Sequence, residues 1–120
     1  MVADIDARRG AVRALRLQRE QEAHDAAEFR RKAERVRHLT ALLDNEDTIW
    51  SNIDKHLQRG SGSAYGQAFQ ALQELAEAHA RSKSDAVFRR NLVRLMAKHG
   101  KRAAWVARLT KAGFLWEPKT

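Results

Sequence analysis

The 120-residue sequence contains no cysteine, a single proline and no apolar run close to the ~20 residues that a membrane-spanning helix needs. Without cysteine the chain has no disulfide, no thiolate metal ligand and no thiol nucleophile. The opening residues, MVADIDARRG, carry acids where a signal peptide has basic residues, and no apolar segment follows them. We therefore expect a cytoplasmic protein with no membrane partner.

β-branched residues are also few, whereas Ala, Leu and Arg are abundant, and this composition favours helices. The spacing of apolar residues predicts helices over residues 4–43, 48–59, 64–80, 85–99 and 101–112. We expect an all-α fold of four to five helices. A long N-terminal helical segment, residues 1–43, precedes a domain of antiparallel helical hairpins, residues 44–120, that is similar to a small α-solenoid.

The N-terminal segment carries its apolar residues on a seven-residue register, but polar residues interrupt it. A helix of about 40 residues is about 60 Å long, which is too long for one compact domain. Either this helix breaks in the polar run at residues 18–25, or its N-terminal part projects. A projecting helix could pair with a second copy of the chain through Val12, Leu15, Phe29 and Val36, across a seam interrupted by Arg19 and Glu22.

The connections between helices carry capping residues. Asp47 or Thr48 is expected to cap the second helix, Ser63 the third and Ser84 the fourth. Gly100 and Gly113 are expected to end the last two helices. The acidic run at residues 44–47 lacks the alternating ligands and the central glycine of a calcium loop, so capping is the better interpretation.

Two consecutive helices share a pattern at an offset of 20 residues, in which Leu72, Leu75 and His79 match Leu92, Leu95 and His99. Each His ends an apolar face, where an imidazole can bind the free carbonyl groups of the helix end. The other predicted core positions are Trp50, Ile53, Leu57, Tyr65, Ala68, Phe69, Ala76, Phe88, Met96, Trp105, Val106, Leu109 and Ala112.

Residues with catalytic potential form no recognisable constellation. The five histidines form no HxxxH pair, and no phosphate-binding glycine loop or nucleophile elbow is present. We expect no enzymatic activity, no metal, no cofactor and no small-molecule substrate.

Positive charge is concentrated in the last third of the chain. Residues 81–120 hold eleven Lys or Arg and two Asp or Glu, whereas residues 40–80 hold two and six. Such an excess indicates an acidic partner. The candidate polyanion-binding residues, on two neighbouring helices, are Arg90, Arg94, Lys98, Lys101, Arg108 and Lys111. A membrane-surface role for Trp105 and Trp116 is the weaker alternative, because the same apolar face is needed to close the core.

From Trp50 to Trp116 the chain resembles the helical C-terminal region of bacterial SWIM zinc-finger proteins and related helical-repeat proteins. The matching residues include Tyr65, Leu72, Leu75, the run His99-x-Lys101-Arg102 and the closing Gly113-Phe114-Leu115. The resemblance implies a helical-repeat interaction module and no catalytic residue. A SWIM zinc site needs cysteines, which this chain lacks, so a zinc role is not implied.

Together these features predict a non-enzymatic helical interaction module. Its basic C-terminal face would bind a polyanion, either nucleic acid through its backbone without sequence specificity, or an acidic protein. The alternative is a protein-binding or homodimerising module that uses the N-terminal helix and does not bind nucleic acid.

Overall fold

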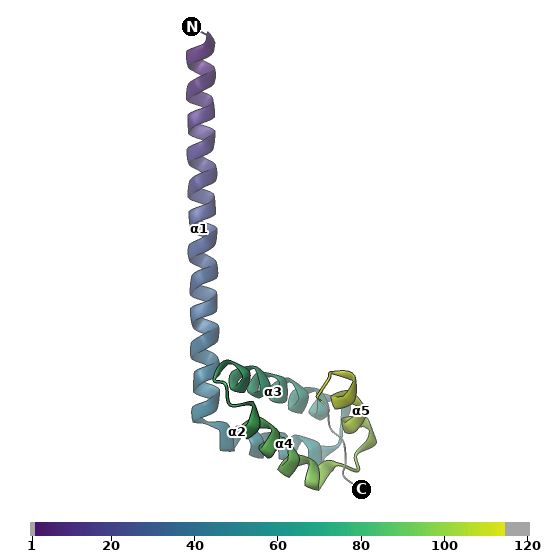
Figure 1. Cartoon of the computed structure of the whole chain (residues 1–120). Coiled ribbons are helices and arrows are strands. Elements are labelled where there is room, and N and C mark those ends of the chain that lie inside the picture. The colour runs from purple at the N-terminus through teal and green to yellow at the C-terminus, as the bar shows by residue number, and fades with distance from the viewer. Residues whose placement is uncertain (1, 115–120) are drawn as a thin grey trace. The chain divides into compact units, whose positions relative to one another are not determined.

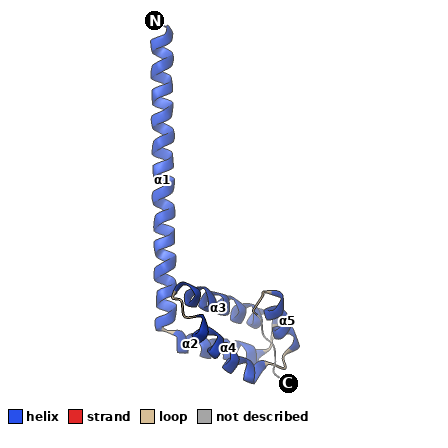
Figure 2. Cartoon of the chain, in the orientation of Figure 1, coloured by secondary structure: helices blue, strands red, loops and turns tan. Residues whose placement is uncertain are grey.

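The computed structural model describes residues 2–114, and these form five α-helices without a β-strand (Figures 1 and 2). The predicted all-α fold with a long N-terminal helix is confirmed. The helices are α1 (Val2–Asp44), α2 (Glu46–Arg59), α3 (Gly62–Arg81), α4 (Asp85–His99) and α5 (Ala103–Lys111). The chain divides into two compact units, residues 1–37 and residues 38–120, so the last turns of α1 belong to the second unit.

Helix α1 is continuous from Val2 to Asp44, so the alternative of a break in residues 18–25 is wrong. The polar run stays helical because its side chains bond to one another along the helix. The Gln18 amide donates to Glu22 at 3.3 Å and the Gln21 amide to Asp25 at 2.9 Å. Pairs four residues apart face each other on a helix and support it.

Helix α2 begins at Glu46, before both of the residues predicted to cap it. Asn45 occupies the N-cap position, but its side-chain amide donates 3.1 Å back to the Ala41 carbonyl, at the end of α1. The prediction of a cap by Asp47 or Thr48 is therefore wrong. Asp47 instead lies with Glu46 in the first turn, where carboxylates suit the positive end of the helix dipole.

Helix α3 begins two residues earlier than expected. Ser61, not Ser63, is its N-cap, and the Ser61 Oγ accepts a 3.1 Å hydrogen bond from the Ala64 N–H. Gly60 ends α2 in the left-handed conformation, with φ 72°, and Ser61 follows it in the extended conformation that an N-cap adopts.

The turn after α3 shows why Ser84 occupies the N-cap position of α4 without capping it. The Ser84 N–H bonds to the His79 carbonyl and the Lys83 N–H to the Ala80 carbonyl, with Lys83 at φ 57°, which is a Schellman ending. The Ser84 side chain faces His79 instead of the α4 amides. A second Schellman ending closes α5, where Gly113 has φ 84° and the Phe114 N–H bonds to the Leu109 carbonyl.

The core of the second unit lies between α2, α3, α4 and α5. Trp105 is fully buried and packs against Tyr65 and Phe69, with ring centroids 6.1 and 6.4 Å apart. The repeated leucines of α3 and α4 are buried at equivalent positions. Predicted core residues that are buried include Ile53, Leu57, Ala68, Leu72, Leu75, Phe88, Leu92, Leu95, Met96, Trp105 and Leu109. Ala112 is exposed, against expectation, because α5 ends at Lys111.

Candidate functional site

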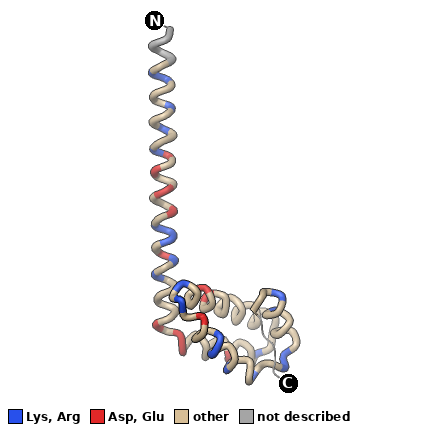
Figure 3. The backbone as a smooth tube through the Cα atoms, viewed as in Figure 1, with Lys and Arg blue, Asp and Glu red and all other residues tan. Residues whose placement is uncertain are grey.

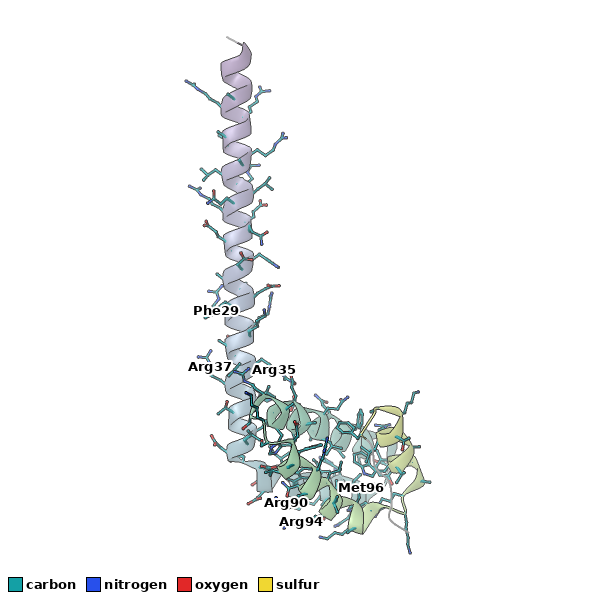
Figure 4. All side chains as sticks on the ribbon, viewed as in Figure 1. Phe29, Arg35, Arg37, Arg90, Arg94 and Met96 are labelled. Atoms are coloured by element: carbon teal, nitrogen blue, oxygen red, sulfur yellow. The ribbon has the colours of Figure 1, made fainter. Side chains whose placement is uncertain are left out.

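The six predicted polyanion-binding residues are all exposed, on α4, on α5 and in the turn between them. Arg90, Arg94 and Lys98 follow one another at four-residue intervals along α4, and we call them the α4 basic row. Figure 4 shows Arg90 and Arg94 together at the edge of α4. Lys101 lies in the turn before α5, and Arg108 and Lys111 lie in α5.

Two members of the α4 basic row line a groove against α2. The groove has a volume of about 450 Å³, and Arg94 and Lys98 lie on its α4 side. Its α2 side carries Asp47 and Asp54. The remaining lining residues are Trp50, Ser51, Asn91 and Leu95. This groove therefore brings cations and carboxylates close together, and Arg90 lies outside it.

Arg108 faces a different helix. Its guanidinium carbon lies 5.8 Å from the centre of the Phe69 ring of α3, a cation–π contact. The structure thus places Arg94 and Lys98 against α2 and Arg108 against α3, so the six residues do not converge on one pocket.

The basic segment has few carboxylates to neutralise it. Residues 81–111 hold ten Lys or Arg and one acidic residue, Asp85. Within the described residues no ion pair involves any of these ten cations. Figure 3 shows Lys and Arg recurring along α4 and α5. Asp47 and Asp54 of α2 lie across the groove from Arg94 and Lys98 and offset part of their charge, but this part of the surface carries a net excess of positive charge at neutral pH.

The two repeated histidines bind carboxylates of α2. The exposed fraction of each is 3%, and both ring nitrogens of each are hydrogen-bonded. His99 Nε2 lies 2.6 Å from Asp54 Oδ1, and its Nδ1 accepts a 2.9 Å hydrogen bond from Arg102 Nε. Because a guanidinium only donates, this geometry assigns His99 as the neutral tautomer with its proton on Nε2. The Nε2–H therefore donates to Asp54.

His79 occupies the equivalent place one helix earlier. Its Nε2 lies 2.6 Å from Glu46 Oε1, and its Nδ1 lies 2.7 Å from the Ser84 hydroxyl. The same Glu46 oxygen accepts hydrogen bonds from Trp50 Nε1 at 3.0 Å and from the Asn91 amide at 2.9 Å. We call the His79–Glu46 and His99–Asp54 pairs the histidine–carboxylate contacts. These contacts link the C-terminal turns of α3 and α4 to α2. The prediction that the two rings bond to free carbonyl groups of their own helix ends is wrong.

Both carboxylates are held in the ionised form. Burial acts to raise the pKa of Glu46, but its hydrogen bonds from Trp50, His79 and Asn91 outweigh burial and leave the pKa below its ordinary value. The hydrogen bond from His99 lowers the pKa of Asp54, and the nearby Lys98 charge adds to that effect. These contacts therefore stabilise the folded second unit at neutral pH.

The sequence contains a signal for these contacts, although it is not a local motif. Glu46, Trp50 and Asp54 are spaced four residues apart, on one face of a helix, and the two histidines lie at one offset on consecutive helices. The partners are 33 and 45 residues apart, so no short-range motif could show them.

The candidate partner residues of α1 include three exposed large apolar side chains. The exposed fractions are 58% for Val12, 48% for Leu15 and 74% for Phe29, and Val36 is half-buried. Leu17, which the seam does not include, is also 58% exposed.

Other site types find little support in the described residues. Among residues 7–114, whose side chains the structure describes, no group of three or more His, Asp or Glu could hold a metal ion. No helix in that part of the chain is both long and apolar enough to traverse a bilayer. Trp105 is fully buried, so it is not available to a lipid surface, and Trp116 lies outside the described residues.

Comparisons with known proteins add no assignment. No family model, no curated protein and no solved structure matches this chain. The resemblance to the helical region of SWIM proteins stays a prediction.

Proposed function

We propose that this protein is a non-enzymatic helical module that binds nucleic acid through its backbone phosphates, using the basic surface of α4 and α5. The observation that carries the proposal is the excess positive charge of residues 81–111, a segment that holds ten cations and one acid and whose cations form no ion pair with the described residues. Cations that neutralise phosphates release condensed counterions, which drives binding that does not depend on sequence.

The α4 basic row is the core of the proposed surface. Its members recur about every 6 Å along the helix axis, since each residue advances the helix by about 1.5 Å. All three are exposed, and α4 buries Phe88, Leu92 and Leu95 instead. A phosphate chain lying along α4 can therefore meet three cations without any rearrangement of the core.

Recognition of bases is not part of the proposal. Base stacking needs exposed aromatic rings beside the cations. On α4 and α5 the aromatic side chains are Phe88 and Trp105, which are buried. Trp50 of α2 lines the groove beside Arg94 and Lys98, but it is half-buried and its Nε1 donates to Glu46. The surface therefore offers charge without a fully exposed ring, which favours backbone contacts without sequence preference.

Substitution of the α4 basic row tests the location of binding. The variant R90Q/R94Q/K98Q should lower duplex DNA affinity and reduce the slope of log K against log salt by about 2.7, since each lost phosphate contact contributes about 0.9. The measurement is fluorescence anisotropy of labelled duplex DNA at several salt concentrations, with circular dichroism to confirm folding.

A matched control removes the same charge from outside the basic segment. The variant R31Q/K55Q/R59Q also loses three positive charges, from exposed positions of α1 and α2. It should keep the wild-type slope within about 0.9, one phosphate contact. Equal losses of DNA affinity in both variants would show that only net charge matters and would contradict a binding surface on α4. An α4 variant that binds DNA as the wild type does would also overturn the proposal. The excess charge would then be better explained by an acidic protein partner.

A further inference from the structure

Residues 8–36 of α1 expose an apolar seam. Val12, Leu15 and Phe29 are 48–74% exposed, and they fall on positions spaced alternately three and four residues apart, together with Ala26 and Ala33. Figure 4 shows Phe29 standing out from the helix. This spacing is the pattern by which two helices pack as a coiled coil. The unusual feature of the seam is its centre, where two charged residues, Arg19 and Glu22, take the places of apolar ones.

The charged centre selects the direction of a partner helix. In a parallel, in-register pair of identical helices, Arg19 faces Arg19 and Glu22 faces Glu22, and like charges repel. In an antiparallel pair whose midpoint lies between residues 20 and 21, Arg19 of each copy lies opposite Glu22 of the other. At that same midpoint Val12 lies opposite Phe29 and Leu15 lies opposite Ala26, so the apolar residues match in the register that matches the charges.

The charges outside the seam follow the same register. Residues 7–19 contain five arginines and no acid, and residues 20–28 contain four acids and no lysine or arginine. Figure 3 shows these segments in succession along α1. In the antiparallel pair Arg13 lies level with Glu28, and Arg16 with Asp25. Helices in such a pair lie 8–10 Å apart, roughly the screening length at physiological salt, so the segments attract. Nearer the ends Arg9 lies level with Lys32, a like-charge pair at the solvated rim.

We infer that α1 is a self-association helix that binds a second copy of this chain in the antiparallel direction, centred between residues 20 and 21. The occupant is a second copy because the central part of the seam complements itself: from Val12 to Phe29, each seam position faces an apolar or oppositely charged residue of the same stretch of sequence. The inference does not depend on nucleic-acid binding, and it is tested in the absence of DNA.

Self-association is tested by the mass of the full chain in analytical ultracentrifugation across a concentration series. The wild type should shift from monomer to dimer as concentration rises, and V12D should stay monomeric. The matched control is L17D, which places the same charge at an equally exposed apolar position of the same helix, off the seam. L17D should dimerise as the wild type does. A monomeric wild type, or equal loss in both variants, would overturn the inference.

The direction of pairing is tested by disulfide formation, which has no background because the natural chain has no cysteine. The variants L15C and A26C are oxidised separately and as a mixture. An antiparallel pair joins them in the mixture and leaves each variant unlinked on its own, because Leu15 lies opposite Ala26. Disulfide-linked dimers of L15C alone and of A26C alone would show parallel pairing, and no linkage in any sample would show that the seam is not an interface.

Discussion

Residues 8–36 and residues 38–114 use the same helical spacing of apolar side chains with opposite results. In the second unit, Trp105, Ile53 and Leu72 are fully buried by neighbouring helices of the same chain. In α1, Phe29 and Val12 remain more than half exposed. An apolar stripe on a helix is therefore buried only where another helix of the same chain packs against it. Where none does, the apolar residues and the charges beside them indicate what kind of partner could cover the stripe.

The charges of the two regions differ in the same way. Along α1 basic and acidic segments alternate, which suits a partner of the same sequence. Along α4 and α5 the cations have almost no acids among them, which suits a partner of opposite charge. If both proposals hold, each dimer carries two basic surfaces, and binding to one long polyanion gains from the effective concentration of the second surface.

The largest expected difference in stability between the two regions comes from replacing one aromatic residue in each by alanine. W105A should lower the free energy of unfolding by about 3–5 kcal/mol, because it empties the centre of the core. F29A removes a ring of comparable kind from the surface of α1 and should change the stability of the monomer by less than about 0.5 kcal/mol. Urea denaturation at a concentration where the wild type is monomeric measures both. Similar losses in the two variants would show that Phe29 is buried within the chain.

The histidine–carboxylate contacts give the next effect. D54A leaves the buried His99 Nε2–H without its acceptor and should cost about 1–3 kcal/mol. D47A removes an exposed carboxylate from the same groove and helix and should cost no more than about 1 kcal/mol, the value of a charge near a helix end. Thermal unfolding of the two variants makes the comparison. Equal costs would mean that the His99 contact adds nothing beyond the charge of α2.

The stability of the second unit should fall at acidic pH because the same two carboxylates become protonated. The pKa values of Glu46 and Asp54 are lower in the folded state than their ordinary values of 4.5 and 3.8. Their contribution to stability is therefore complete above those ordinary values and is lost as pH falls through the lowered ones. We expect stability to decline as pH drops below about 4.5 and the E46Q/D54N variant to show a shallower decline. If stability declines with falling pH as steeply in that variant as in the wild type, other carboxylates control the acid sensitivity.

The sequence predicted most of the second unit because its helices have clear periodicity. The bounds of α4 were predicted as residues 85–99, and its buried face was predicted from Phe88, Leu92 and Leu95. The capping residues were less predictable, since Ser61 and Ser63 are equally good caps by type. Which one serves depends on Gly60, whose left-handed conformation ends α2 immediately before Ser61.

The histidine–carboxylate contacts could not be read from local patterns. His79 and His99 were predicted to bond to the free carbonyl groups of their own helix ends, but their carboxylate partners come from α2 and depend on how that helix packs. The helix that each basic residue faces could likewise not be predicted, because it depends on the packing of the helices. Sequence put Arg94 and Arg108 on neighbouring helices, and only the packing shows that one faces α2 and the other faces Phe69 of α3.

The measurement that tests the central claim most directly is the titration of labelled duplex DNA with the wild-type protein at increasing salt. The basic surface of α4 and α5 predicts binding at low salt, with a slope of log K against log salt steeper than about −2.7, which corresponds to the three cations of the α4 basic row. The absence of binding at low salt, or an affinity that does not change with salt, would contradict the account.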